Sequence, residues 1–112
     1  QVYYVGLLAG KNDLKLLEET KEGRNINRHY YSNEEIAEEV QRPVVKSLLN
    51  LFSFRNQSEA FDLEGTIDIE TPTAHSIVIK RQNKDKSVTA VAEIDLQKQT
   101  YRVIENGIEV TF

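Results

Sequence analysis

The sequence predicts an α+β fold, with helices in the first part of the chain and an antiparallel sheet in the second. Between residues 33 and 57 apolar side chains recur every three or four positions, which is typical of amphipathic helices. From about Leu63 to Phe112 apolar and polar residues alternate between short polar turns, which is typical of strands. The 112 residues contain no cysteine, so the fold must depend on packing and not on disulfides.

The first residues read differently from the rest. Residues 2–8 form a short apolar run rich in β-branched and aromatic side chains, which predicts a strand buried on both faces of a parallel sheet. No other segment offers a parallel partner, and the chain has no methionine. We therefore expect the sequence to begin inside a domain of a larger protein.

Residues 9–31 form a polar connection far longer than the usual 4–6 or so residues, and loops of that length are often functional. One or two helical turns are expected within residues 13–20, with Leu14 and Leu17 facing inward.

Two helices follow the long loop. Ser32 and Glu35 have the spacing of a capping box, so a helix is expected from about residue 33 to residue 40. Pro43 interrupts that helix but suits the first position of another, expected over residues 43–57. The second helix should have a wide apolar face made of Val44, Val45, Leu48, Leu49, Leu51 and Phe52.

About five strands are expected in the remainder. The first holds Ile67 and Ile69 and ends at a turn around Pro72, and three more cover residues 77–79, 88–96 and 101–104. Asn106-Gly107 is a strong hairpin signal because both central residues of a type I′ turn need positive φ. The last strand is expected to run to Phe112.

Composition and motifs exclude several functions. The net charge is −4 with no dense basic run, so no nucleic-acid partner is expected. No apolar stretch approaches the roughly 20 residues that span a bilayer, so no membrane association is expected. Because the chain has no glycine-rich phosphate loop, catalytic triad order or zinc motif, we predict no catalytic residue, metal ligand or cofactor. His75 lies in a polar turn and receives no role.

One segment has a composition that suits sugars. Residues 21–32 contain Arg24 and Arg28 together with asparagines, His29 and two tyrosines. Guanidinium and amide groups can bind vicinal hydroxyls, and tyrosines can pack on sugar rings. The structural alternative is that Arg28 and His29 fix the loop by bonding carbonyls, with Tyr30 and Tyr31 in the core.

Three blocks of sequence resemble the C-terminal part of sucrose phosphorylase, a member of the α-amylase family. They are residues 1–13 (QVYYVGLLAGKND), 23–32 (GRNINRHYYS) and 42–46 (RPVVK). The resemblance implies that residues 1–61 hold strand eight, the following loop and the closing helices of a (β/α)8 barrel, and that residues 62–112 form a small antiparallel β domain.

The resemblance also implies a reaction for the parent protein. Such enzymes transfer glucose from sucrose to phosphate, giving α-glucose 1-phosphate and fructose, with two carboxyls about 5–5.5 Å apart. Those carboxyls would lie upstream of Gln1, so the chain is not expected to catalyse anything alone. Sucrose and phosphate would be the parent's ligands, and the location would be cytoplasmic.

The motif match places a substrate-binding arginine of the family at Arg24, with Arg28 as the second candidate. Arg28 could instead pair with Asp13 or with loop carbonyls. The family usually has Asp where this chain has Asn25, so a salt bridge from that position is absent here.

Two other interpretations stay open. A sibling phosphorylase acting on sucrose 6′-phosphate or glucosylglycerate would share much of this sequence, and residues 62–112 could be an independent interaction or sugar-binding module. Exposed apolar surface could also make the isolated chain self-associate.

Overall fold

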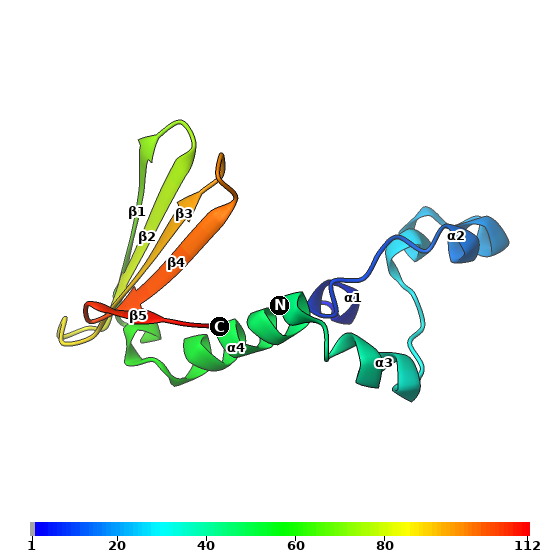
Figure 1. Ribbon diagram of the computed structural model, residues 1–112, viewed down its shortest axis with the longest axis horizontal. Coiled ribbons are helices and arrows are strands. Elements are labelled where there is room, and N and C mark those ends of the chain that lie inside the picture. The colour runs from blue at the N-terminus through cyan, green and yellow to red at the C-terminus, as the bar shows by residue number, and fades with distance from the viewer. Residues whose placement is uncertain (1) are drawn as a thin grey trace. The chain divides into compact units, whose positions relative to one another are not determined.

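The computed structural model describes residues 2–112. The chain separates into two compact units, residues 1–52 with Phe112, and residues 53–111. Helices occupy the first unit and a five-stranded sheet occupies most of the second, in agreement with the predicted order (Figure 1). The expected division into residues 1–61 and 62–112 stays a prediction.

The helical unit begins with α1 (Tyr4–Leu7), so the predicted strand over residues 2–8 is wrong. Leu8 donates its backbone N–H to the carbonyl of Tyr4 at 2.9 Å, which closes one helical turn. Periodicity cannot distinguish a short apolar run in a strand from one in a helix. Because no strand in the described part of the chain pairs with this segment, a helical turn satisfies backbone groups that an orphan strand would leave unpaired.

The long loop contains two short elements, α2 (Leu14–Thr20) and the 3-10 helix η1 (Gly23–Asn27). The helix within residues 13–20 is thus confirmed, but Leu14 is 62% exposed, so its inward orientation is wrong. Leu16 and Leu17 are half-buried instead. At 3.6 residues per turn Leu16 lies about 160° around the helix from Leu14 and about 100° from Leu17, so the covered side of α2 is centred between Leu16 and Leu17 and not between Leu14 and Leu17.

The two helices after the loop have nearly the predicted bounds, α3 (Asn33–Glu39) and α4 (Pro43–Gln57). Val45 on α4 is fully buried, and Val5 and Leu8 from the α1 segment are almost so. Val44 is 53% exposed, because only part of the predicted apolar face of α4 is covered within this chain.

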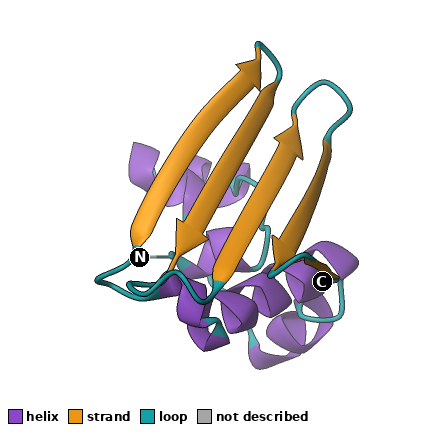
Figure 2. Ribbon diagram, turned by 90° about the vertical axis from the view of Figure 1, so that its left-hand side faces the viewer, coloured by secondary structure: helices purple, strands orange, loops and turns teal. Residues whose placement is uncertain are grey.

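The second unit contains the end of α4, the 3-10 helix η2 (Glu59–Phe61), and an antiparallel meander. Its strands lie side by side in chain order (Figure 2). They are β1 (Thr66–Thr73), β2 (Ser76–Gln82), β3 (Thr89–Asp95), β4 (Thr100–Glu105) and β5 (Ile108–Val110). The expected five-stranded antiparallel sheet is confirmed.

Two details of the sheet differ from expectation. β1 continues through Pro72 to Thr73, with an irregular register between Glu70 and Thr73. An edge strand tolerates proline because the missing N–H would face solvent. Pro72 therefore lies within β1, and the predicted turn comes after it, between Thr73 and Ser76. The last strand ends at Val110, short of Phe112.

The hairpin turn before β5 follows the prediction. Asn106 and Gly107 have φ values of 48° and 83°, the positive values that a type I′ turn requires. Asn106 also accepts the backbone N–H of Thr89 on its side-chain oxygen at 2.8 Å, which ties the turn to β3.

Beneath the sheet, η2 anchors a small aromatic cluster. The rings of Phe54 and Phe61 meet edge to face at 5.9 Å, and the Arg81 guanidinium lies 5.7 Å from the Phe61 ring centre. Ala60, which precedes Phe61 in η2, is fully buried, so η2 forms part of the core of this unit.

Candidate functional site

Arg24 lies in η1, within the long loop. Its Nε and Nη2 atoms donate to one carboxylate oxygen of Glu22 at 2.9 and 2.8 Å. The side chain is nevertheless 66% exposed, so the rest of the guanidinium can donate to a further ligand. The local pairing fixes the direction of the arginine and leaves its outer edge accessible.

The turn that carries Arg24 is held on both sides. The side-chain amide of Asn25 donates to the Thr20 hydroxyl at 3.0 Å, and the backbone N–H of Asp13 donates to the carbonyl of Ile26 at 2.6 Å. Asn25, where the family usually has Asp, therefore joins η1 to the end of α2 through a neutral hydrogen bond.

Arg28 is exposed and forms no ion pair within residues 2–112. The alternative in which Arg28 pairs with Asp13 is wrong, because Asp13 binds His29. Tyr30 is 73% exposed and Tyr31 is half-buried, so only the second of these tyrosines contributes to the core.

His29 lies between two carboxylates. Its Nδ1 atom is 2.7 Å from Asp13 Oδ2, and its Nε2 atom is 3.3 Å from Glu35 Oε1. The Tyr4 hydroxyl donates to the His29 carbonyl at 2.9 Å, and the Tyr31 ring meets the imidazole edge to face at 4.6 Å. His29 thus connects the start of α2, the start of α3 and the α1 segment.

Both carboxylates have a second structural role. Asp13 accepts the Leu16 N–H at 2.8 Å and so caps α2. Glu35 accepts the Ser32 N–H at 2.7 Å, while the Ser32 hydroxyl accepts the Glu35 N–H at 3.2 Å. The predicted capping box of α3 is confirmed, and His29 joins the caps of two helices.

This arrangement shifts three pKa values. The hydrogen bond to Asp13 raises the pKa of His29, partial desolvation opposes that shift, and Glu35 adds to it. The hydrogen bond from His29 lowers the pKa of Asp13, with the Leu16 amide helping. The Ser32 amide, followed by His29, lowers the pKa of Glu35. The cluster therefore favours a protonated imidazole between two ionised carboxylates.

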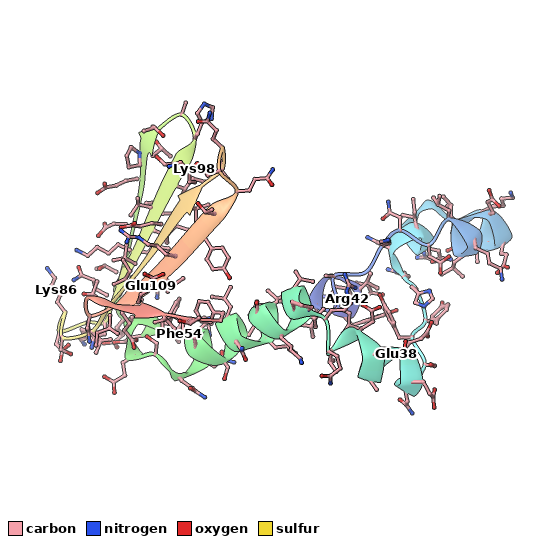
Figure 3. All side chains as sticks on the ribbon, viewed as in Figure 1. Glu38, Arg42, Phe54, Lys86, Lys98 and Glu109 are labelled. Carbon is pink, nitrogen blue, oxygen red and sulfur yellow. The ribbon has the colours of Figure 1, made fainter. Side chains whose placement is uncertain are left out.

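The cluster lines an open pocket of about 740 Å³. Arg42 donates from Nη1 to the carbonyls of Leu8 and Ala9 at 3.3 and 3.4 Å and pairs with Glu39. Glu38 and Arg42 are labelled in Figure 3. The residues lining the pocket are Gly10, Lys11, Asn12, Asp13, Lys15, His29, Tyr31, Glu35, Glu38, Glu39 and Arg42.

Gly10 is required at the edge of this pocket. A Cβ atom there would collide with the Tyr31 hydroxyl and would lie 2.9 Å from a methyl carbon of Val5. The loop backbone therefore passes directly against the Tyr31 hydroxyl, and glycine permits that approach.

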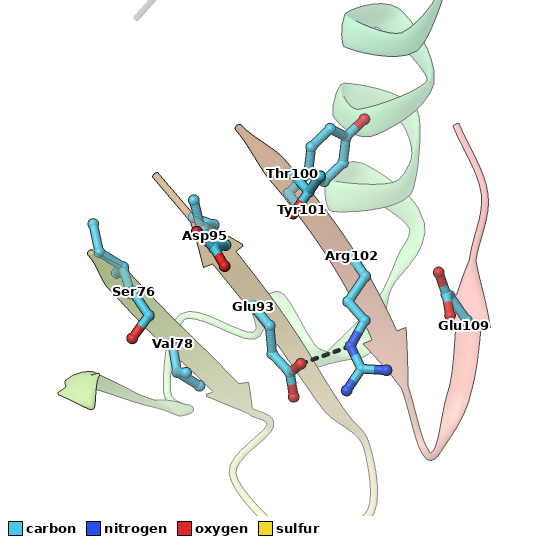
Figure 4. Close-up of a pocket in the computed structure, with 10 residues that line it drawn as sticks. Ser76, Val78, Glu93, Asp95, Thr100, Tyr101, Arg102 and Glu109 are labelled. Atoms are coloured by element: carbon cyan, nitrogen blue, oxygen red, sulfur yellow. Dashed lines mark hydrogen bonds and ion pairs between the residues drawn. The ribbon is translucent and has the colours of Figure 1, made fainter. Parts of the chain in front are cut away.

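A second hollow of about 460 Å³ lies on the sheet (Figure 4). Its central feature is the ion pair between Arg102 Nε on β4 and Glu93 Oε2 on β3 at 2.6 Å, with Asp95 also on β3 and Glu109 on β5. Arg102 and Glu93 are 53% and 39% exposed, so their pairing is a surface interaction of small energetic value. Within residues 2–112, no group of three or more His, Cys, Asp or Glu side chains is arranged so that it could hold a metal ion.

The sequence alone did not reveal the double pairing of His29. It offered His29 only as one of two residues that fix the loop by bonding carbonyls, whereas the imidazole contacts carboxylates and the carbonyl of His29 accepts from Tyr4. One feature of the sequence could have indicated this pairing: Asp13, before His29, and Glu35, after it, both occupy helix-capping positions.

The chain is similar over its full length to known phosphorylases. It is 71% identical over 112 residues to a sucrose phosphorylase of Streptococcus mutans, covering 100% of this chain and 23% of that protein. It is 50% identical over 93 residues to a sucrose phosphorylase of Bifidobacterium adolescentis, covering 83% of this chain and 18% of that protein. No protein-family model matches the chain.

The fold agrees with a solved structure as well. The crystal structure of sucrose 6F-phosphate phosphorylase from Thermoanaerobacter thermosaccharolyticum superposes with a TM-score of 0.87 and 43% identity. That match covers 100% of this chain and 23% of the solved chain. The chain thus spans about a quarter of the length of the proteins it matches.

The fold and the sequence together identify this chain as part of a sugar phosphorylase. The chain belongs to the sucrose phosphorylase family and corresponds to a C-terminal part of such a protein. No helix within residues 2–112 is long and apolar enough to span a membrane.

Proposed function

We propose that this chain is part of an enzyme that transfers glucose from sucrose to phosphate, producing α-glucose 1-phosphate and fructose. The observation that carries the proposal is 71% identity, over all 112 residues, to a protein with that specificity in its name. The chain contributes no catalytic carboxylate. Nucleophile and acid/base come from elsewhere in the polypeptide, and neither metal nor cofactor takes part.

The contribution of this chain to the substrate site is Arg24. Its guanidinium is oriented by Glu22 and exposed at its outer edge, so it can donate to hydroxyls of the bound glucosyl unit that do not react. Arg28 is the second candidate, because it lies one residue beyond η1 and is exposed.

The remaining parts have supporting roles in this proposal. Within residues 1–61, α3 and α4 close a (β/α)8 barrel, and the long loop lies at the barrel face where such enzymes assemble their sites. Residues 62–112 form the small β domain. The enzyme acts in the cytoplasm, where sugar phosphates are used.

A sibling phosphorylase is the second candidate. It is favoured by the agreement in fold with a sucrose 6F-phosphate phosphorylase, at 43% identity. The higher identity of 71% to a sucrose phosphorylase supports sucrose as the donor.

The test is phosphorolysis by the full-length polypeptide that contains this chain. Sucrose, sucrose 6′-phosphate and glucosylglycerate are supplied separately with phosphate, and α-glucose 1-phosphate is measured. Sucrose should give the highest kcat/KM. A higher kcat/KM with sucrose 6′-phosphate or glucosylglycerate would support the sibling phosphorylase that uses that donor. Inactivity with all three donors would refute both candidates.

A further inference from the structure

The contacts of His29 suggest a role that composition did not indicate. The histidine is not close in sequence to either of its carboxylate partners, being 16 residues after Asp13 and 6 before Glu35. Each partner caps a helix, so the imidazole joins the N-termini of α2 and α3. The segment between those two helices includes η1 and therefore Arg24.

The loop has only short elements of its own to hold it. α2 has no buried residue, and neither has η1. The bonds that close its base are Asp13 N–H to the Ile26 carbonyl at 2.6 Å and Asp13 to His29 at 2.7 Å. A loop with so little apolar burial depends on such polar contacts to keep one conformation.

The contact between His29 and Asp13 is better shielded than an ordinary surface pair. The side chain of His29 is 34% exposed and that of Asp13 is 19% exposed, with the Tyr31 ring against one edge of the imidazole. Partial shielding reduces the screening that makes exposed ion pairs weak.

We propose that His29 is a positioning residue that holds the loop carrying Arg24, through simultaneous bonds to Asp13 and Glu35. The doubly protonated imidazole donates from both ring nitrogens, whereas the neutral ring can donate from only one. Loss of one proton therefore opens one side of the clamp. This inference rests on the proposed role of Arg24 in substrate binding.

The direction of the pH effect follows from the three groups. His29 has a raised pKa, so its contribution to the clamp is present below that pKa and is lost as pH rises through it. Asp13 and Glu35 have lowered pKa values, so their contribution is present at higher pH and is lost as pH falls through those values. The clamp is complete between the two limits. Other charged groups around the pocket are Lys11, Lys15, Glu38, Glu39 and Arg42.

The first measurement follows the loop without relying on activity. Amide hydrogen exchange of residues 9–31 is compared in the full-length wild type, His29→Gln and the control His75→Gln, whose histidine lies exposed in the β1–β2 turn. Exchange should be about tenfold faster or more in His29→Gln and unchanged in His75→Gln. Equal exchange in wild type and His29→Gln would overturn the proposal.

The second measurement connects the clamp to function. KM for the donor should rise about tenfold in His29→Gln with a smaller change in kcat, because a displaced Arg24 weakens binding. In the wild type, KM should rise as pH rises through the pKa of His29, and this step should vanish in His29→Gln. An unchanged KM and an unchanged pH profile would contradict the inference.

Glu35→Gln guards against a folding defect in His29→Gln. Glutamine can retain the capping box, since its amide oxygen can accept the Ser32 N–H, but it removes the charge beside His29. The step in KM should move to lower pH because that charge raises the pKa of His29. A step that does not move would overturn the proposal. If the wild type were inactive but the loop exchanged faster in His29→Gln, the proposed function would be refuted while the role of His29 in holding the loop would be supported.

Discussion

Arg24→Ala is the most direct test of the proposed contribution of this chain to a substrate site. The substitution removes a charged donor whose outer edge is exposed and whose partner within the chain is Glu22. Hydrogen bonds to a charged group contribute about 1.5–3 kcal/mol. If Arg24 makes one such bond to the glucosyl unit, kcat/KM should fall by roughly 10- to 150-fold.

The same change should hardly affect stability. Arg24 and Glu22 are 66% and 52% exposed, and exposed pairs contribute about 0–1 kcal/mol. Thermal unfolding of Arg24→Ala in the full-length polypeptide should therefore resemble that of the wild type. A large loss of kcat/KM with unchanged unfolding would separate a binding role from a structural one.

Initial rates with varied sucrose and saturating phosphate provide the assay. Arg102→Ala is the matched control, because it removes an arginine that is also exposed and also paired with one glutamate, on the sheet. Its kcat/KM should stay within about twofold of the wild type. If Arg24→Ala also stays within twofold while Arg28→Ala falls, Arg28 is the substrate ligand. If neither arginine matters, the sugar-binding interpretation of this loop is refuted.

Three further predictions concern stability and association. Gly107→Ala should destabilise the protein by about 1 kcal/mol, because Gly107 has a φ of 83°, which alanine adopts only with strain. The urea midpoint of unfolding measures this change. Gly23→Ala is the comparison, because a Cβ atom at Gly23 would meet no atom within 4 Å. Val45→Ala should cost about 2–3 kcal/mol, since Val45 is fully buried and two methyl groups are lost; an unchanged midpoint would mean that the site collapses freely. The isolated 112-residue chain should self-associate, because Ile67, Ile69 and others are more than half exposed; a monomer at high concentration in sedimentation would contradict this.

The sequence predicted best where local chemistry alone determines the structure. Ser32 and Glu35 form the capping box, Pro43 starts α4, and Asn106-Gly107 makes the hairpin turn, and all three depend on residues within a few positions. The apolar run at residues 2–8 was misassigned because strand and helix have the same pattern over so short a length.

The candidate site was predictable in part for a related reason. Composition indicated the loop that carries Arg24, but nothing in it indicated that His29 would bind Asp13 and Glu35. Those contacts arise only when α2 and α3 start near each other. Pairings set by tertiary structure have no local pattern, so sequence spacing could not distinguish Arg28 from His29 as the partner of Asp13.

The contrast between the exposed Arg24 and the paired His29 suggests how the long loop keeps one conformation while Arg24 stays exposed. In its proposed role Arg24 must be accessible to a ligand, so its turn cannot be held by burial of apolar side chains, and η1 buries none. Hydrogen bonds at the base of the loop can hold it without covering Arg24, and that is where Asp13, His29 and Glu35 lie. The polar residues that made the segment suit sugars therefore divide into two groups. Arg24 is exposed, whereas His29 and Asn25 bond to other parts of the loop and, in the proposed arrangement, keep the arginine in place.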